Sequence, residues 1–501
     1  MAVFLAFARR TGARFTLFVR VRFALFVGAT TMVAGVAACG GGGGSPSAVL
    51  PRATTAPTAN GHVDWTMFGY DATRSGKNPH ETVLGRSNVA SLHLHWTFQT
   101  AGSIFAQPVV AANVMLPSGI ADVVYVVDDA GYVYALNAAT GATIWTKSFG
   151  TSQNSCGDLS QWGNTSTPVI DRAYNALYVV DGLGSAHALN LATGATSVGW
   201  PAGIAVVPDA SFEYTYSALA LTPAGSLYTE SAGYCDNGTY FGSIAALNPA
   251  NGARTATWVP QASPNWGNGM WSAGGVVADP RPGVTDLYVS TGNAFPESAL
   301  YSDSVVRLTG ALAPVAANWQ YAASVPNDDD FGANPVTFAV PGCPAQLVAE
   351  QKNGQLDLYD LDAIAAGPVQ QVAIGMPTIY GRNIDPASYD AATSMLYVAN
   401  ATTNAPYGEG LLAFTFFNCA LMLAWQRAGT ATSPLSQPVI ANGVVYYATG
   451  STKTIAAFNA TTGAPLWTSA PFGAPSYTAP TVVNGALFAV SFDKHVYAYG
   501  L

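Results

Sequence analysis

The sequence predicts an all-β protein, an eight-bladed β-propeller of four-stranded antiparallel blades whose ring is closed by the N-terminal strand. The first observation is the stretch 123–145, VVYVVDDAGYVYALNAATGATIW, where β-rich runs meet at an Asp-x-Gly turn and an Asn-x-x-Thr-Gly turn. Such turns between apolar runs are strong hairpin signals. The second is the recurrence of this pattern along the chain, and the third is that the two ends of the chain carry complementary parts of one blade.

The pattern recurs with a tryptophan at the end of its last strand, and a proline often opens its first strand. Periods of about 40 to 60 residues with several strands each are typical of propeller blades. The clearest copies are ALNAATGATIW (135–145), ALNLATGATSVGW (188–200), ALNPANGARTATW (246–258) and AFNATTGAPLW (457–467). Weaker copies end at Trp319 and Trp425, and another around 358–375 has no tryptophan. We expect each indole to pack on the next blade and to donate one hydrogen bond there.

Ring closure follows from the two ends of the repeat region. NVASLHLHW ends at Trp96 with no preceding strands of its own, and the last run ends at Leu501 without a tryptophan strand. A strand near 92–100 is therefore expected to complete the C-terminal blade, which removes exposed sheet edges. This makes eight blades.

Composition excludes some classes of function. Charged residues make up only 9% of the chain, and hydrophobic residues 50%. Lys and Arg form no basic cluster in the body of the chain, so nucleic acid is not an expected partner. The histidines are scattered and no Ser-His-Asp context is present, which argues against a hydrolase.

The N-terminus has the features of a targeting segment. Residues 1–22 carry five arginines and no acidic residue, and the apolar run 23–38, short for a membrane span, ends in Val-Ala-Ala before Cys39. This resembles the bacterial lipobox, in which the cysteine becomes the lipidated first residue. We therefore expect a lipoprotein signal peptide over 1–38, a flexible Gly/Ser/Pro/Thr-rich tether over 39–60, and the propeller over 61–501. The alternative is an ordinary cleaved signal followed by a chance cysteine.

Strand direction predicts which loops share a face of the ring. In a blade with strands A to D, the D-to-A and B-to-C connections lie on one face, which we call the first face, and the other connections lie on the second face. The first-face loops are rich in carboxylates, amides, indoles and one lysine, a composition suited to a hard cation and an anionic ligand. These loops are QWGNTST (161–167), SAGYCDNGTYF (231–241), PNWGNGMW (264–271), TGN (291–293), NDDDFGAN (327–334) and KNG (352–354).

The repeat A-x-N-x-x-T-G-x-x-x-W and the opening W-x-x-F-G-x-D-x-x-R-x-G resemble the quinoprotein (pyrroloquinoline quinone, PQQ) propeller superfamily over essentially 64–501. That superfamily includes PQQ-dependent alcohol dehydrogenases and also propeller lipoproteins of outer-membrane assembly that bind no cofactor. The repeat does not separate these two groups.

The resemblance implies a role for individual residues. Asn293 of Thr-Gly-Asn matches a calcium ligand, and Asp236 falls near a second one, its register uncertain by one or two positions. Asp330 matches the aspartate proposed to take the substrate proton or to assist hydride transfer. Lys352 of Lys-Asn-Gly matches the cation that contacts the quinone, and Trp271, a few residues from the expected place, matches the stacking indole. Thr167 is a further expected cofactor contact.

The sequence also departs from the dehydrogenases. It has no adjacent cysteine pair and no Cys-x-x-Cys-His, so no c-type haem is expected and an electron acceptor would have to be a partner. Each matched motif is also an ordinary turn sequence. Two hypotheses follow: a Ca²⁺/PQQ-dependent oxidoreductase acting on a hydroxyl group, or a non-enzymatic scaffold that binds a protein or polysaccharide in the cell envelope, on the periplasmic or surface side of what is expected to be the outer membrane.

Four cysteines remain once Cys39 is assigned to lipid. Four cysteines in an oxidising compartment allow three pairings. The predicted loops place Cys156 and Cys235 on the first face, and Cys343 and Cys419 on the second face. We expect disulfides within these two pairs, and free buried thiols are the alternative.

Overall fold

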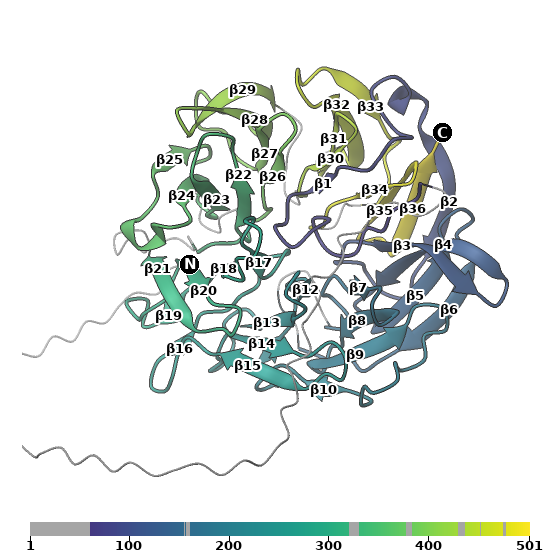
Figure 1. Cartoon of the computed structure of the whole chain (residues 1–501), viewed down its shortest axis with the longest axis horizontal. Helices are drawn as coiled ribbons and strands as arrows, with labels where there is room; N and C mark the ends of the chain where they lie inside the picture. Colours follow the sequence, from purple (N-terminus) through teal and green to yellow (C-terminus); the bar gives the residue numbers. More distant parts are fainter. Residues whose placement is uncertain are drawn as a thin grey trace, which may run out of the picture. The chain divides into compact units, whose positions relative to one another are not determined.

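The computed structural model describes residues 61–154, 156, 161–319, 330–376, 383–428, 436–450, 452–473 and 477–501. Within them, eight antiparallel sheets are arranged around a ring (Figure 1), so the predicted eight-bladed propeller is confirmed. The expected signal peptide 1–38, the tether 39–60 and Cys39 lie outside the described residues. In the described part of the chain, no helix has the length and hydrophobicity needed to cross a membrane.

Each blade contributes four strands, the first of which lies nearest the centre of the ring (Figure 1). Blades 1 to 4 are formed by β3 (Val109–Leu116), β4 (Gly119–Val127), β5 (Tyr132–Asn137) and β6 (Thr143–Ser148); β7 (Val169–Asp171), β8 (Ala176–Val180), β9 (Ser185–Asn190) and β10 (Ile204–Ala205); β12 (Ala220–Leu221), β13 (Leu227–Gly233), β14 (Ser243–Leu247) and β15 (Arg254–Trp258); and β17 (Val277–Ala278), β18 (Leu287–Ser290), β20 (Ser304–Leu308) and β21 (Pro314–Trp319).

The remaining four blades follow in chain order. They are formed by β22 (Val336–Ala339), β23 (Ala345–Glu350), β24 (Gln355–Asp360) and β25 (Gln370–Ala373); β26 (Ser388–Asp390), β27 (Met395–Asn400), β28 (Gly410–Phe417) and β29 (Ala420–Ala428); β30 (Val439–Ala441), β31 (Val444–Thr449), β32 (Thr454–Asn459) and β33 (Pro465–Thr468); and β34 (Thr481–Val483), β35 (Ala486–Val490), β36 (His495–Gly500) and β2 (His93–Gln99). Short additional elements are β1 (Lys77–Asn78), β11 (Glu213–Tyr214), β16 (Trp266–Gly267), β19 (Ala294–Phe295) and the 3₁₀ turns η1 (Val89–Ser91) and η2 (Ile364–Ala366).

The ring closes as the sequence predicts. Strand β2, from the N-terminal part of the propeller, pairs antiparallel with β36 from His93 opposite Gly500 to Gln99 opposite His495. Trp467 of blade 7 then donates its indole N–H to the carbonyl of Leu92, 2.9 Å away. The last blade is therefore a composite sheet that contains strands from both ends of the propeller.

The repeated Trp and Thr-Gly positions pack blade against blade. The Trp145 indole donates a 2.9 Å hydrogen bond to the Leu191 carbonyl of the next blade. A Cβ on Gly194, whose φ is 69°, would lie 2.7 Å from that indole, so only glycine fits there. The side chain of Asn190 accepts from the backbone of Ala192 and so shapes the same turn. The same indole-to-carbonyl bond is made by Trp96, Trp200, Trp425 and Trp467.

Residues 65–78, which we call the axial strap, touch the innermost strand or its entry in every blade. Trp65 pairs with Val110 of blade 1. Further along, carbonyl groups of the strap accept hydrogen bonds from the backbone of other blades, and the side chains of Arg74 and Asn78 donate to backbone carbonyls. Strand β1, which ends the strap, also pairs with β30. These contacts reach Ile170, Leu219, Ala278, Thr337, Tyr389, Ile440 and Val482, in blades 2 to 8 respectively. The opening sequence motif is therefore a structural hub of the ring.

Two disulfides join loops of different blades. Cys156 pairs with Cys235, and Cys343 pairs with Cys419, each with Cα atoms 5.5 Å apart. These are the two pairs expected from the predicted faces of the loops. The first links the loop before blade 2 to blade 3, and the second links blade 5 to blade 6.

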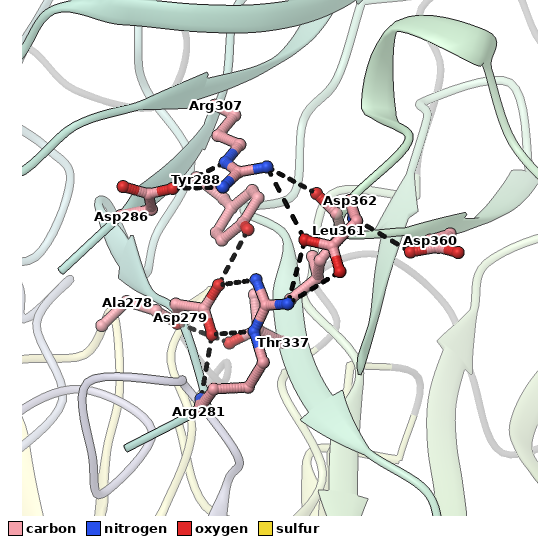
Figure 2. Close-up of polar contacts among 10 residues, drawn as sticks. All are labelled: Ala278, Asp279, Arg281, Asp286, Tyr288, Arg307, Thr337, Asp360, Leu361 and Asp362. Carbon is pink, nitrogen blue, oxygen red and sulfur yellow. Dashed lines mark hydrogen bonds and ion pairs between the residues drawn. The ribbon is translucent and has the colours of Figure 1, made fainter. Parts of the chain in front are cut away.

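An ion-pair network joins blades 4 and 5 on the second face (Figure 2). Arg281 lies 2.7 Å from Asp279 of its own turn and 2.9 Å from Asp362, in the loop that follows β24. Arg307 pairs with Asp286 at 2.5 Å and reaches Asp362 at 3.8 Å. Because Asp362 is shared by two arginines, this network fixes the two blades relative to each other.

Candidate functional site

Three of the predicted site residues meet on the first face. The Lys352 Nζ lies 2.5 Å from the Asp330 carboxylate, and the Trp271 indole N–H donates to the same carboxylate at 3.0 Å. Lys352 also lies over the Trp271 ring, 4.6 Å from its centroid. The side chains of Asp330 and Lys352 are only 2% and 11% exposed. A buried ion pair against an indole is thus formed by three loops, one that enters blade 4 and two that belong to blade 5.

The backbone of these loops holds the cluster in place. Lys352 begins the turn after β23, and its N–H donates to the Asp330 carbonyl at 3.1 Å. Asp330 lies in the loop that enters blade 5, six residues before β22. A main-chain bond therefore supports the side-chain ion pair between the same two residues.

Gly292 explains why the Thr-Gly-Asn motif carries a glycine. A Cβ at this position would lie 2.8 Å from the Asp330 carboxylate and 3.3 Å from the Trp271 indole nitrogen. The absence of a side chain lets the backbone of blade 4 approach the polar groups closely. Asn293 follows directly and is half-buried, and its carbonyl accepts a hydrogen bond from the backbone of Asn268.

Asp303 is a site residue that the sequence interpretation missed. It lies at the end of the same B-to-C loop as Asn293, and its N–H donates to the Gly292 carbonyl at 3.2 Å. Burial, with a further contribution from the negative charge of Asp330, raises the pKa of Asp303 to about 7. Its position on the first face was available from strand direction alone. What the sequence lacked was a motif around Tyr-Ser-Asp-Ser to single it out.

Tyrosines lie close to the acidic groups of the site. Burial raises the pKa of Tyr240, and the charges of Asp236 and Asp330 raise it further. Burial together with the charges of Tyr234, Asp236 and Asp330 raises the pKa of Tyr214. Both phenols therefore stay protonated at neutral pH and can act as hydrogen-bond donors.

The remaining predicted residues lie apart from the ion pair. Asp236 is exposed in its loop and accepts a 2.6 Å hydrogen bond from Tyr240, and no contact with Asn293 is seen within the described residues. Thr167 is buried, and its hydroxyl accepts from the Gln107 backbone at 2.9 Å, which ties blade 2 to blade 1. Over the described ranges, no three His, Cys, Asp or Glu side chains group closely enough to hold a metal by themselves.

The donor chemistry of the cluster nevertheless suits a hard cation and an anionic planar ligand. Asp330, Asp303 and Asn293 offer oxygen atoms, the preferred ligands of Ca²⁺. The Lys352 ammonium has three N–H donors, so it can interact with a ligand as well as with the Asp330 carboxylate. Trp271 offers an indole face, and Gly292 leaves the backbone open beside it.

Family comparisons match both ends of the propeller. The family model described as "Glucose/ethanol/alcohol dehydrogenase, beta-propeller domain", of the PQQ type, matches residues 65–214. A second PQQ-type model, described as "Outer membrane protein assembly factor BamB", matches residues 422–500. The chain is an eight-bladed PQQ-repeat propeller. A search of the curated proteins finds no match to this PQQ-repeat propeller.

Solved structures resemble the PQQ-repeat propeller in fold. Quinohemoprotein alcohol dehydrogenase from Pseudomonas putida HK5 superposes with a TM-score of 0.67 at 15% identity, over 87% of this chain and 80% of that one. A europium-containing methanol dehydrogenase gives 0.66 at 15% identity, over 87% and 98%. BamB from Moraxella catarrhalis gives 0.51 at 15% identity, over 82% and 100%. At these identities the likeness shows the fold alone, and the similar structures include dehydrogenases as well as BamB.

Proposed function

We propose that this PQQ-repeat propeller is a quinoprotein oxidoreductase that acts on a hydroxyl group, with its site at Asp330, Lys352 and Trp271. The observation that carries the proposal is the buried Asp330–Lys352 pair against the Trp271 indole. A scaffold surface has no need to bury a carboxylate and an ammonium, because both lose hydration. A site for charge-separating chemistry does need groups that are shielded from water.

Each residue has a defined task in this proposal. Bound PQQ supplies two-electron oxidation of the hydroxyl-bearing carbon. Lys352 orients and polarises a carbonyl oxygen of the quinone, and Trp271 supports its plane. Asn293 and Asp236 provide oxygen ligands for Ca²⁺, which requires the loop that carries Asp236 to approach Asn293. Asp330 accepts the substrate hydroxyl proton, held in place by the Trp271 N–H and the Lys352 ammonium.

A quinone titration tests the proposal. PQQ is added to the metal-free full chain with and without Ca²⁺, and tryptophan fluorescence is followed. We expect saturable, calcium-dependent quenching, with an apparent Kd raised at least about tenfold by Lys352→Met because a charge-assisted contact is lost. Asp330→Asn should keep quinone binding but lose turnover with alcohols.

The matched control is Lys453→Met. Lys453 lies in the equivalent B-to-C turn of blade 7, is exposed and has no place in the cluster. It should bind PQQ as the wild type does. Absence of quenching in the wild type, or equal loss in both lysine variants, would rule out the quinone site.

The alternative is an envelope scaffold that binds a protein partner. The match of 422–500 to the BamB model supports it, as does a cavity of about 310 Å³ in the same region. This cavity lies between blades 7 and 8 and is lined in part by Trp467, Phe472 and Tyr499. Failure of the quinone titration would favour this function. In either case we propose a location in the cell envelope, probed below through Cys39.

A further inference from the structure

Two acidic side chains of blades 5 and 6 are buried and carry oxygens that have no hydrogen-bond partner among the described residues. Glu350 and Asp385 are each 1% exposed. Both carboxylate oxygens of Glu350, and Oδ2 of Asp385, have no hydrogen-bond partner within the described part of the chain. Buried polar atoms in folded proteins are nearly always paired with protein, water or an ion. These three oxygens therefore indicate a ligand that is not protein.

The fold brings the two acids together at the junction of blades 5 and 6. Glu350 is the last residue of β23 and, by strand alternation, shares a side with Val348, which packs in the hydrophobic cluster between these blades. Asp385 lies in the loop that enters blade 6, three residues before β26. The Asn383 N–H donates to the Lys352 carbonyl at 3.5 Å, which connects the two chain segments.

Asp385 occupies a position that other blades use for neutral side chains. In three other blades, the residue just before the opening proline has a neutral side chain that bonds to the backbone of a neighbouring segment. These residues are Gln107, Asn334 and Gln437. Asp385 precedes Pro386 in the same way but carries a carboxyl group. Its charge also raises the pKa of Tyr216, from the loop before blade 3 on the far side of the ring, in addition to the effect of burial.

A third unpartnered group comes from blade 7. Tyr447 of β31 is fully buried, and its hydroxyl has no hydrogen-bond partner among the described residues. Burial raises the pKa of Tyr447, and the negative charges of Asp385, Glu409 and Glu350 raise it further. Blades 5, 6 and 7 thus each contribute one oxygen-bearing side chain.

Among the residues that the structure describes, no positive charge compensates the two acids. Burial alone raises the pKa of Asp385 to about 8, while burial and the charge of Asp385 raise that of Glu350. Within the described residues no Lys, Arg or His acts on either group. An uncompensated pair of this kind is stable only as neutral acids or around a bound cation. An oxygen-only donor set selects a hard cation.

We propose that Glu350, Asp385 and Tyr447 form a cation site that takes a divalent ion of the Ca²⁺ class and joins blades 5, 6 and 7. Two carboxylates balance its charge, and the phenol, waters and nearby carbonyls complete its shell, since Ca²⁺ accepts six to eight oxygen ligands. This site is separate from the ligands proposed for quinone binding and does not depend on that function.

Calcium binding without any quinone tests the site. The full chain is stripped with EDTA, and binding is measured by equilibrium dialysis and by the shift in Tm. We expect saturable binding and a raised Tm in the wild type, with affinity lowered at least about tenfold in Asp385→Asn and Glu350→Gln. The matched control Asp357→Asn changes a buried acid of β24 that already accepts a hydrogen bond from Gln371, and it should leave this binding intact.

A second measurement keeps the test decisive if a variant folds poorly. Tb³⁺, a calcium substitute, is added to the wild type and emission is excited through tyrosine; Tyr447→Phe should retain binding and lower the affinity. Absence of saturable Ca²⁺ and Tb³⁺ binding in the wild type would overturn the site. So would unchanged Ca²⁺ affinity in both isosteric variants, which would indicate neutral acids with bound water. The second outcome leaves the quinone titration unaffected, because neither Glu350 nor Asp385 belongs to the proposed quinone site.

Discussion

Asp357 is a buried carboxyl group whose titration should be visible in the stability of the protein. It lies in β24, fully buried, and accepts a 2.9 Å hydrogen bond from Gln371. Burial raises the pKa of Asp357 from 3.8 to about 6. The hydrogen bond from Gln371 lowers the pKa and so offsets only part of the effect of burial. The folded state therefore binds more protons than the unfolded state between these two pKa values, and stability falls as pH rises through this window.

Asp357→Asn should remove this pH dependence. The free energy of unfolding of the variant minus that of the wild type is expected to rise between pH 4 and 6, by at most about 3 kcal/mol, and to level off above. Urea unfolding at several pH values measures it. A difference that stays constant across this range would contradict the raised pKa.

At the scale of single residues, the candidate site could be predicted only in part from the sequence. Asp330, Lys352 and Trp271 were found from motifs and strand direction, and their side chains meet. Asp303, Glu350 and Asp385 were not, because no local motif marks a carboxyl group whose surroundings come from other blades. Thr167 lies on the predicted face, but its hydroxyl accepts a hydrogen bond from the backbone of Gln107. This contact depends on the side-chain rotamer and on the neighbouring segment, neither of which can be read from the position of the loop.

Neighbouring blades pack through a contact between the indole of one blade and the glycine of a Thr-Gly turn in the next. Gly194→Ala should destabilise the protein for two reasons: the left-handed backbone at φ 69° and a Cβ 2.7 Å from Trp145. The first costs about 1–2 kcal/mol, and the overpacking adds about 1–3 kcal/mol. Chemical denaturation of the purified chain measures the sum.

Gly283→Ala is the matched variant. Gly283 also has a left-handed φ, 79°, but a Cβ there would meet nothing within 4 Å. It should show the backbone cost alone. Equal losses in the two variants would mean that the indole contact does not limit the turn residue.

Most elements followed from the repeat, and the exceptions have local causes. Trp200 was expected to end a strand, but β10 starts only at Ile204. The copy that contains Trp200 has two more residues between its Thr-Gly turn and the tryptophan than the first copy. The extra residues form a turn, in which the Trp200 N–H bonds the Ser197 carbonyl, and the indole still reaches Pro249 of the next blade.

For the molecule as a whole, blade number and ring closure were predictable because a period and a missing strand can be read from one chain. The role of the axial strap was not, since its partners lie in all eight blades and carry no shared motif. The opening motif was recognised only as part of a resemblance. Its function as a hub emerges from hydrogen bonds that join residues up to hundreds of positions apart.

The lipid anchor expected at Cys39 is also a property of the whole molecule, because it decides where the propeller resides. Cys39→Ser should move the protein from the membrane fraction to the soluble fraction, since the modified cysteine is the only anchor proposed. Immunoblots of fractionated cells measure it. An unchanged distribution would favour an ordinary cleaved signal.

The axial strap has a consequence for how the chain is made. Residues 65–78 and β2 leave the ribosome early, whereas their partners Val482 and β36 are synthesised hundreds of residues later. Until then the strap lacks its bond to blade 8, and β2 has no strand to pair with. The growing chain therefore carries unpaired backbone, a state prone to misassembly, throughout its synthesis. The ring can close only once its last blade exists, because β2 completes that blade.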